Sequence, residues 1–400
     1  MSLGISGVYQ MRLKIGDIDV PITPNNVTRF EITEYLDRFL PTIYINFRDT
    51  SGFLTHLTHF DSRYNTLTVS FSNDSNIDAQ KDIKFKVFRR KPESIVQMSN
   101  DVSINGVLDV KNIFSPNYER GWELKSIEEI INEISAEIGF TTTQINVGLT
   151  QPVSIVQPNW TNSQFLNYLC DNVACTNGDF AFFAFVDIPG FLKTRLNFMS
   201  LTNLLKQKSV QTFINLSEVK NSDDMPIYSY NIIDSYDLVA HLGIEKQTYG
   251  YFDYLTGEYI TRTIDLEDAD FVSLSNYYAY DSNDSIGGLS QNLIGTTNRF
   301  SLDYEPVARG NYYKKSNSLV KIWIHSSGTN KINPGNIVKI IFPETSQGES
   351  ISSYQYSGYW LVEQIKHTFG STYITSLLLT RPGFDTDQTT TFVKAKKIKK

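Results

Sequence analysis

The chain has few cysteines and no long hydrophobic segment. Its two cysteines, Cys170 and Cys175, lie in a segment predicted as helical, where they would point to different sides, so we expect reduced thiols and no disulfide. The longest apolar run, residues 180–186, is far shorter than the ~20 residues that a membrane-spanning helix needs. Residues 1–7 lack the basic and apolar regions of a signal peptide, which favours synthesis in a reducing compartment.

An excess of positive charge is also missing. The chain carries 43 acidic and 36 basic side chains, a net charge of −7 at pH 7, which argues against a protein whose main task is to bind nucleic acid. We therefore predict no sequence-specific binding of DNA or RNA. The negative charge is concentrated in a tyrosine-rich segment, residues 249–317, which contains Asp253, Glu258, Asp265, Glu267, Asp268 and Asp270.

Motifs for catalysis or cofactor binding are missing as well, since the sequence has no phosphate-binding loop, zinc-protease helix or nucleophile elbow. His56 and His59 have the spacing of two metal ligands on a helix, but no recognisable motif supplies a third ligand. Residues 281–285 begin like a calcium loop, yet Ile286 and Asn292 occupy the positions that need Gly and Glu. We predict no catalytic residue, no cofactor and no metal site.

The clearest pattern that is present lies in residues 333–382. A turn signal, Asn333-Pro334-Gly335-Asn336, precedes three segments of alternating hydrophobicity, which predict an antiparallel sheet in a barrel or sandwich. Alternation places three sets of side chains on one face, namely Val338, Ile340 and Phe342, then Tyr359, Leu361 and Ile365, then Tyr373, Leu377 and Leu379.

Residues 121–205 have a different pattern, typical of a small α/β unit. Ser126 and Glu129 form a capping box, and Gly139 ends the helix that follows. Isoleucines at helical spacing predict its buried side, namely Ile127, Ile130, Ile131, Ile134 and Ile138. A second helix begins with a similar cap at Thr161. We interpret six residues of these two regions as core, namely Trp160, Phe165, Leu169, Trp360, Leu361 and Val362.

The order of these patterns predicts a β-rich multidomain (α+β) fold. Strand patterns in residues 8–20, 43–49, 65–71, 83–89 and 103–110 predict a first antiparallel β-barrel over residues 1–120. The α/β domain follows at residues 121–205. A second barrel comprises residues 206–248 and 318–382, with the acidic insertion at 249–317 between its parts. Residues 383–400 form a lysine-rich C-terminal tail.

This order resembles the central baseplate hub protein of contractile-tailed bacteriophages, a family that includes the late-control hub proteins. Residues 35–52 resemble the family's first-barrel strand and the turn after it. Residues 159–169 resemble the tryptophan-led helix of its second domain. Residues 335–379, with His367 before the last strand, resemble the closing strands of its second barrel.

The resemblance implies a structural protein without enzymatic activity, built from two barrels like those of tail-tube proteins. It implies a homotrimer that adapts a threefold central spike to the sixfold tail tube and leaves an axial channel for DNA. The implied partners are the spike protein, the first tail-tube ring, other baseplate proteins and the tape-measure protein. The implied location is the virion tail baseplate, assembled in the bacterial host cytoplasm.

Several alternatives stay open at this stage. A cell-wall glycosidase at the tail tip needs only a pair of carboxylates, and a carbohydrate-binding adhesin could stack sugars on Tyr277, Tyr278 and Tyr280. The acidic insertion either lines a channel, where its carboxylates would repel DNA phosphates, or forms a solvated outer face. The lysine-rich tail either contacts a partner or serves as a solubilising end.

Overall fold

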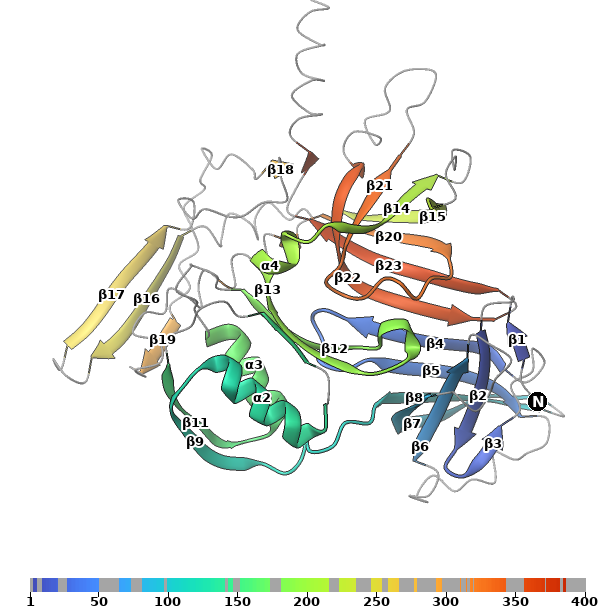
Figure 1. Cartoon of the computed structure of the whole chain (residues 1–400), viewed down its shortest axis with the longest axis horizontal. Helices are drawn as coiled ribbons and strands as arrows, with labels where there is room; N and C mark the ends of the chain where they lie inside the picture. The colour runs from blue at the N-terminus through green and yellow to red at the C-terminus, as the bar shows by residue number, and fades with distance from the viewer. Residues whose placement is uncertain are drawn as a thin grey trace, which may run out of the picture.

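Strands dominate the structure, a computed structural model, and helices are few (Figure 1). It describes residues 3–5, 9–20, 27–49, 65–72, 81–96, 99–140, 143–146, 152–172, 181–215, 223–234, 246–253, 258–265, 277–278, 293–296, 310, 314, 317–318, 320–342, 356–370, 372–381 and 384–385. The strand-rich class predicted from the sequence is confirmed.

Six strands close into a barrel, which we call the barrel. They are β14 (Ser209–Asn215), β15 (Met225–Asp234), β20 (Val320–Ser327), β21 (Ile337–Ile341), β22 (Gly358–Phe369) and β23 (Tyr373–Arg381). Neighbours pair in the order β22, β21, β14, β15, β20 and β23, and β23 pairs again with β22. Apolar side chains fill the interior, among them Phe213, Ile324, Val338, Trp360 and Leu377. The barrel therefore has a packed core and is not itself a pore.

The antiparallel sheet predicted from the last part of the sequence is confirmed, because β21 pairs with β22 and β22 with β23. The turn before β21 also forms as predicted. Gly335 has a φ of 80°, and the backbone N–H of Asn336 donates to the carbonyl of Asn333 over 3.1 Å. Proline followed by glycine favours this turn, since only glycine adopts the positive φ without strain.

The prediction that Tyr359, Leu361 and Ile365 share one face is wrong. The ladder between β22 and β23 shifts between Val362 and Gln364, and one extra residue in a strand reverses the alternation beyond it. Ile365 therefore lies in the barrel core, whereas Leu361 packs in a separate cluster outside the barrel and Tyr359 is exposed.

A second set of paired strands, which we call the first section, lies beside the barrel (Figure 1). It comprises β1 (Leu3–Ile5), β2 (Tyr9–Ile15), β3 (Ile18–Val20), β4 (Val27–Tyr35), β5 (Thr42–Asp49), β6 (Thr66–Ser72), β7 (Lys81–Val96) and β8 (Ser99–Leu108). Its strands pair in the order β2, β6, β7, β8, β5 and β4. No ladder joins β4 to β2 within the described residues, so closure of a first barrel stays a prediction.

The first section is joined to the barrel by main-chain pairing. β4 pairs antiparallel with the second half of β22, so one sheet continues from the first section into the barrel. β4 had no clear strand pattern in the sequence, because its inward face carries the charged Glu34 next to the apolar Phe30 and Ile32. Residues 8–20, predicted as one alternating segment, form two strands around a turn at Gly16, whose φ is 60°.

The middle of the chain forms an α/β unit. It comprises β9 (Tyr118–Lys125), α2 (Ile127–Ile138), β10 (Thr143–Asn146), β11 (Val153–Trp160), α3 (Asn162–Asn172), β12 (Phe182–Asp187), the 3-10 helix η3 (Pro189–Phe191), β13 (Arg195–Ser200) and α4 (Leu201–Leu205). β12 pairs antiparallel and β10 parallel with β13, while β9 and β11 form a separate antiparallel pair. The capping box of Ser126 and Glu129 and the left-handed Gly139 at the end of α2 are confirmed.

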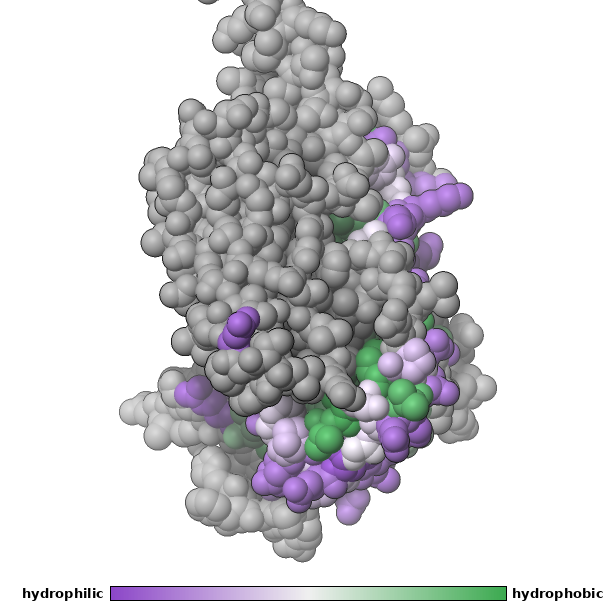
Figure 2. Space-filling model, turned by 90° about the vertical axis from the view of Figure 1, so that its left-hand side faces the viewer, coloured by the Kyte–Doolittle hydropathy of each residue, from purple (hydrophilic) through white to green (hydrophobic). Residues whose placement is uncertain are grey.

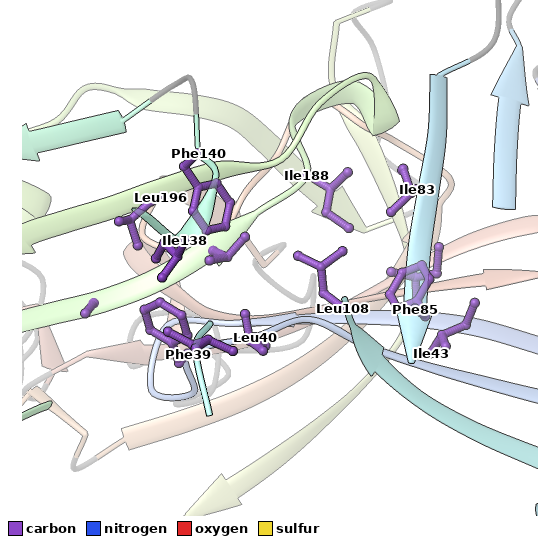
Figure 3. Packing of buried hydrophobic residues seen from close by; sticks show 14 of the residues in the cluster. Phe39, Leu40, Ile43, Ile83, Phe85, Leu108, Ile138, Phe140, Ile188 and Leu196 are labelled. Carbon is purple, nitrogen blue, oxygen red and sulfur yellow. The ribbon is translucent and has the colours of Figure 1, made fainter. Parts of the chain in front are cut away.

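The five isoleucines predicted for the buried side of α2 are all buried. One apolar core extends from the first section into the α/β unit. Figure 3 shows its members from both parts, with Ile138, Phe140 and Leu196 at one end, Ile83 and Phe85 at the other, and Leu108 and Ile188 between them. Since the core is shared, the two parts are held together by hydrophobic burial.

The remaining described strands lie apart from the large sheet. β16 (Lys246–Asp253) pairs antiparallel with β17 (Glu258–Asp265) and parallel with β19 (Leu293–Thr296). β18 (Tyr277–Tyr278) pairs with β24 (Phe384–Asp385). These elements belong to the acidic segment and to the start of the tail.

Candidate assembly surface

A polar face runs across the joint between the first section and the barrel. It is the side of strands β5, β4, β22, β23 and β20 that points away from both apolar cores, and we call it the polar wall. Its side chains include Arg29, Glu31, Thr33, Tyr44, Lys321, Trp323, His325, Glu363, Lys366, Thr368, Ser376 and one apolar residue, Leu378. Cross-strand neighbours make it continuous, since Lys366 lies opposite Thr33 on one side and Ser376 on the other.

The charges of the polar wall are paired with one another. Glu31 accepts from Arg29 at 2.8 Å and lies 3.8 Å from the ammonium of Lys366. Lys321 contacts Glu363 at 2.7 Å. The side chains of Glu31 and Glu363 are only 11% and 15% exposed, so these ion pairs are partly shielded from solvent. The wall is hydrophilic without a strong excess of either charge.

His325 continues this face on β20. Its Nδ1 lies 2.7 Å from the hydroxyl of Ser376. Burial lowers the pKa of His325, and repulsion from Lys366 lowers it further. The ammonium of Lys366 also lies 5.9 Å from the centre of the Trp323 ring, a cation–π contact. His325 is thus held in its neutral form more strongly than a free histidine.

Behind the polar wall, a buried polar cluster connects all three parts of the fold. Glu34 of β4 and His367 of β22 are each 1% exposed, and their side chains approach to 3.4 Å. Glu34 also accepts the backbone N–H of Ile188 in the α/β unit at 2.7 Å. The other ring nitrogen of His367 lies 2.8 Å from the hydroxyl of Tyr373, which donates to the carbonyl of Thr329. We call this group the junction cluster.

Asp187 lies next to the junction cluster and is fully buried. Arg195 binds both its carboxylate oxygens, and Asn197 donates to it at 2.9 Å. Burial nevertheless raises the pKa of Asp187, and the nearby carboxylate of Glu34 adds to this. Buried charges of this kind need partners, so the cluster fixes the positions of β4, β12 and β13 relative to one another.

The structure places the six core candidates in two regions. Phe165 and Leu169 of α3 are fully buried, and Trp160 is partly buried beside them. Phe165 stacks on Trp122 with 5.1 Å between ring centres. The other three candidates are fully buried in β22, but only Trp360 and Val362 lie inside the barrel, because Leu361 packs against the α/β unit.

The acidic candidates are brought together only in part. Asp253 and Glu258 are directly opposite each other where β16 meets β17, and Asp265 ends β17 at the other end of the hairpin. Glu258 is exposed. Glu267, Asp268 and Asp270 lie outside the described residues, as do His56, His59 and Tyr280 and the calcium-like segment 281–285. The roles assigned to these residues stay hypotheses.

Thiol reactivity, metal binding and membrane insertion can each be assessed in the described residues. Cys170 is a buried free thiol, and its burial raises its pKa to about 12, so it is a poor nucleophile. No three His, Cys, Asp or Glu side chains of the described residues gather as a metal site would require. In the same part of the chain, no helix has the length and apolarity needed to cross a membrane.

The α/β unit exposes some apolar surface. Leu124 and Val156, on the outer face of β9 and β11, are 72% and 60% exposed. Figure 2 views the side of the molecule on which β9 and β11 lie, and it shows a small hydrophobic area bordered by hydrophilic residues. A patch of this size is common on soluble proteins and does not define a site by itself.

The polar wall and most of the junction cluster have no signature in the sequence. Glu363 and Lys366 were visible as charges in a strand pattern, but the bulge hid the face to which they belong. Glu34 and His367 are far apart in the sequence, and only the pairing of β4 with β22 brings them together. No local signal could have indicated that contact.

Comparison with solved structures places this fold among phage tail proteins. No protein family model matches the chain, and no curated protein matches it in sequence. The 43 kDa tail protein of prophage MuSo2 from Shewanella oneidensis is similar over 94% of this chain and 98% of that one, with a TM-score of 0.58 and 12% identity. A tail protein from Neisseria meningitidis MC58 is similar over 95% of this chain and 99% of that one, with a TM-score of 0.56 and 10% identity.

A third similar structure comes from a secretion system. The E. coli protein c3393, a component of the type VI secretion system with structural similarity to the T4 phage tail proteins gp27 and gp5, covers 92% of this chain and 76% of that one. Its TM-score is 0.50 and its identity is 10%. The chain therefore has the fold of phage tail proteins, and the resemblance to baseplate hub proteins noted in the sequence is confirmed at the level of the fold.

Proposed function

We propose that this chain is a structural hub of a phage-type tail baseplate. It assembles as a homotrimer that binds the central spike protein on one side and the first tail-tube ring on the other. Other baseplate proteins and the tape-measure protein are further partners. The fold shared with phage tail proteins over almost the whole chain supports this proposal. Function then arises from assembly, and the chain catalyses no reaction.

The polar wall is the observation that carries the proposal. In an assembled ring, the wall faces an axial channel through which DNA passes. DNA phosphates bind where cations are in excess and repel carboxylates. Here the cations Arg29, Lys321 and Lys366 are paired with Glu31 and Glu363, so DNA meets a wetted surface to which it neither adheres nor is strongly repelled.

The finer division of the chain is part of the same proposal. The first section forms a tube-like barrel within residues 1–120, followed by the α/β domain at 121–205. The second tube-like barrel is formed by residues 206–248 and 318–382. Three copies then present six related units, which matches a threefold spike to a sixfold tube. The insertion at 249–317 and the tail at 383–400 lie outside this repeating framework.

The trimer is tested by electron microscopy and sedimentation of the purified chain. End-on views should show a threefold ring with a central opening, and sedimentation velocity should give the mass of a trimer. If single copies predominate, the measurement is repeated with the spike protein added. Single copies in both conditions would contradict the proposed hub.

The channel is tested by charge reversal on the polar wall. Glu31→Lys with Glu363→Lys leaves the neighbouring cations unpaired and should slow DNA ejection from virions that carry the variant. Glu123→Lys with Glu128→Lys, at two exposed positions of the α/β unit, is the matched control for net charge. Normal ejection by the wall variant, in particles with intact rings, would contradict a channel position for this face.

A further inference from the structure

The first section and the barrel contain the same arrangement of strands. In chain order, β4, β5, β6, β7 and β8 correspond to β15, β20, β21, β22 and β23. Both sets pair in the same spatial order, β6-β7-β8-β5-β4 in one and β21-β22-β23-β20-β15 in the other. Every neighbouring pair within both sets is antiparallel. The chain thus contains one sheet topology twice.

Two bulges in each set correspond, and the β7–β8 ladder has one further shift, between Pro92 and Ser94. The β4–β5 ladder shifts between Val27 and Arg29, and the β15–β20 ladder shifts between Ile227 and Ser229. The β7–β8 ladder shifts directly after Val87, as the β22–β23 ladder does after Val362. Bulges bend a strand and increase its twist, so matching bulges give the two sets matching edges.

The registers extend this correspondence to single residues. Thr33 lies opposite Thr42 as Ile233 lies opposite Lys321. Lys91 lies opposite Ser103 as Lys366 lies opposite Ser376. By the same count, β4 residue Ile32 corresponds to Ile232 of β15, and His367 of β22 corresponds to Pro92 of β7.

Within one chain, the two sets are joined at one place. The first half of β22 pairs with β21, and beyond its bulge the same edge pairs with β4, with Lys366 opposite Thr33. This joint uses the outer edge of β4 and the second half of β22. The corresponding edges elsewhere are those of β15 and of the second half of β7.

Those two corresponding edges have no partner among the described residues. The ladder of β6 on β7 ends at Lys86, and only β8 pairs with the rest of β7. The ladder of β14 on β15 involves only Met225, Pro226 and Ile227, and beyond it only β20 pairs with β15. An open strand edge offers unused main-chain donors and acceptors to another strand.

We propose that β15 of one copy pairs antiparallel with β7 of the next copy, and so repeats between chains the β4–β22 joint found within each chain. The register follows from the equivalences, with Ile233 opposite Lys91 and Ile232 opposite Pro92 of the neighbouring copy. This inference rests on the proposed homotrimer and names the edges that hold it together. Each copy contributes one edge of each kind, so the contact is head-to-tail and a ring can close.

Exposed apolar side chains on β15 support its role as one edge of the contact between copies. Tyr228, Tyr230 and Ile233 are 52%, 47% and 37% exposed along this edge. Large apolar residues on an open edge strand favour pairing with another strand, and natural monomers usually avoid them. A second copy of this chain is the occupant that the internal repeat specifies, because it carries the matching β7 edge.

Pro92 should remove one hydrogen bond from the contact between copies. In the internal joint, Leu36 donates its backbone N–H to the carbonyl of Glu363, so alternation makes His367 a position whose main chain faces β4. At the equivalent position Pro92 has no N–H to donate, and the joint between copies has one hydrogen bond fewer than the joint within a copy. The proline also hinders unspecific pairing before assembly.

Cysteine cross-linking tests the register directly. Lys91→Cys with Ile233→Cys, in a Cys175→Ser background, places two thiols at a non-hydrogen-bonded pair, where Cα atoms are about 4.5 Å apart. Mild oxidation should give covalent dimers and trimers on non-reducing gels, with no larger species, and reduction should return single chains. Cys170 is buried and does not interfere.

Two matched variants serve as controls. Thr33→Cys with Lys366→Cys has the same geometry within one chain and should close an internal disulfide, which shows that the oxidation works. Lys91→Cys with Ser229→Cys is out of register by roughly 13 Å and should give far less cross-linking.

The outcomes separate this inference from the proposed hub. A trimer in sedimentation velocity that lacks the Lys91–Ile233 cross-link, while the internal control closes, would overturn the strand pairing and leave the hub proposal standing. Equal cross-linking at the out-of-register pair would overturn the register. A chain that stays monomeric with and without the spike protein would overturn both proposals.

Discussion

Gly328→Ala should destabilise the protein through a single aromatic ring. Gly328 follows β20 and donates its backbone N–H to the carbonyl of Tyr373 over 2.9 Å. A Cβ atom added there would lie well under 3.0 Å from several ring atoms of Tyr373. The ring cannot move freely, because it stacks on Phe369 with 4.8 Å between ring centres and is 6% exposed. Either the loop or the ring must shift.

The size of the effect follows from the contacts that the ring makes. Overpacking of a well-packed core costs about 1–3 kcal/mol. If the ring moves, the hydroxyl of Tyr373 also loses its contacts with His367 and Thr329, each worth about 1 kcal/mol. We therefore expect Gly328→Ala to lower the free energy of unfolding by about 3–5 kcal/mol.

A double-mutant cycle measured by urea denaturation tests this explanation. Tyr373→Ala removes every ring atom that the added Cβ would meet and has its own cost, but Gly328→Ala introduced into that variant should cost less than about 1 kcal/mol more. The coupling energy between the two positions should then exceed about 2 kcal/mol. Strictly additive effects, or a Gly328→Ala protein as stable as the parent, would refute the proposed clash.

Three further predictions concern Phe165, Glu34 and His325. Phe165→Ala should cost about 3–5 kcal/mol in urea denaturation, because it leaves a cavity in the core of the α/β unit. Glu34→Gln should cost about 2–4 kcal/mol in the same assay, because it breaks the buried contact with His367. The pKa of His325 is lowered in the folded protein, so its contribution to stability is present above the unfolded pKa of about 6.5 and is lost as the pH falls below that value. Between pH 7.5 and 5.5, the His325→Gln protein should therefore lose less stability than the parent protein.

Each of these has an outcome that would count against it. A Phe165→Ala protein with normal stability but impaired assembly would place that side chain at an interface. Glu34→Gln and His367→Gln should be strongly non-additive, and independent effects would mean that the two side chains do not act as a pair. Parallel pH profiles for the His325→Gln protein and the parent would mean that His325 does not titrate in the folded state as its surroundings indicate.

Local patterns in the sequence were sufficient for several elements. The capping box, the isoleucine spacing and Gly139 together predicted α2 with its buried side, because each depends only on residues within a few turns of one another. The turn at residues 333–336 was predictable for the same reason, since Pro334 and Gly335 fix their own backbone angles. Alternation also indicated that β21 to β23 pair antiparallel.

Features that depend on distant pairing were not predictable. Nothing near Val362 indicates the bulge that reverses the face of β22, because the shift arises in its ladder with β23. β4 lacked a clear pattern because the charged Glu34 lies on its buried side. The polar wall and the junction cluster exist only after β4 meets β22, so they required the three-dimensional structure.

The strand β22 has a consequence for the order in which the chain folds. It pairs with β21 and β23 in the barrel and with β4 in the first section, and the side chains of Glu31 and Thr368 that meet across this joint are 337 positions apart. During synthesis, the edge of β4 therefore stays unpaired until residue 369 has left the ribosome. Such non-local pairing slows folding and exposes aggregation-prone intermediates. Chaperone dependence during production, relieved once residue 369 has emerged, follows from this single shared strand.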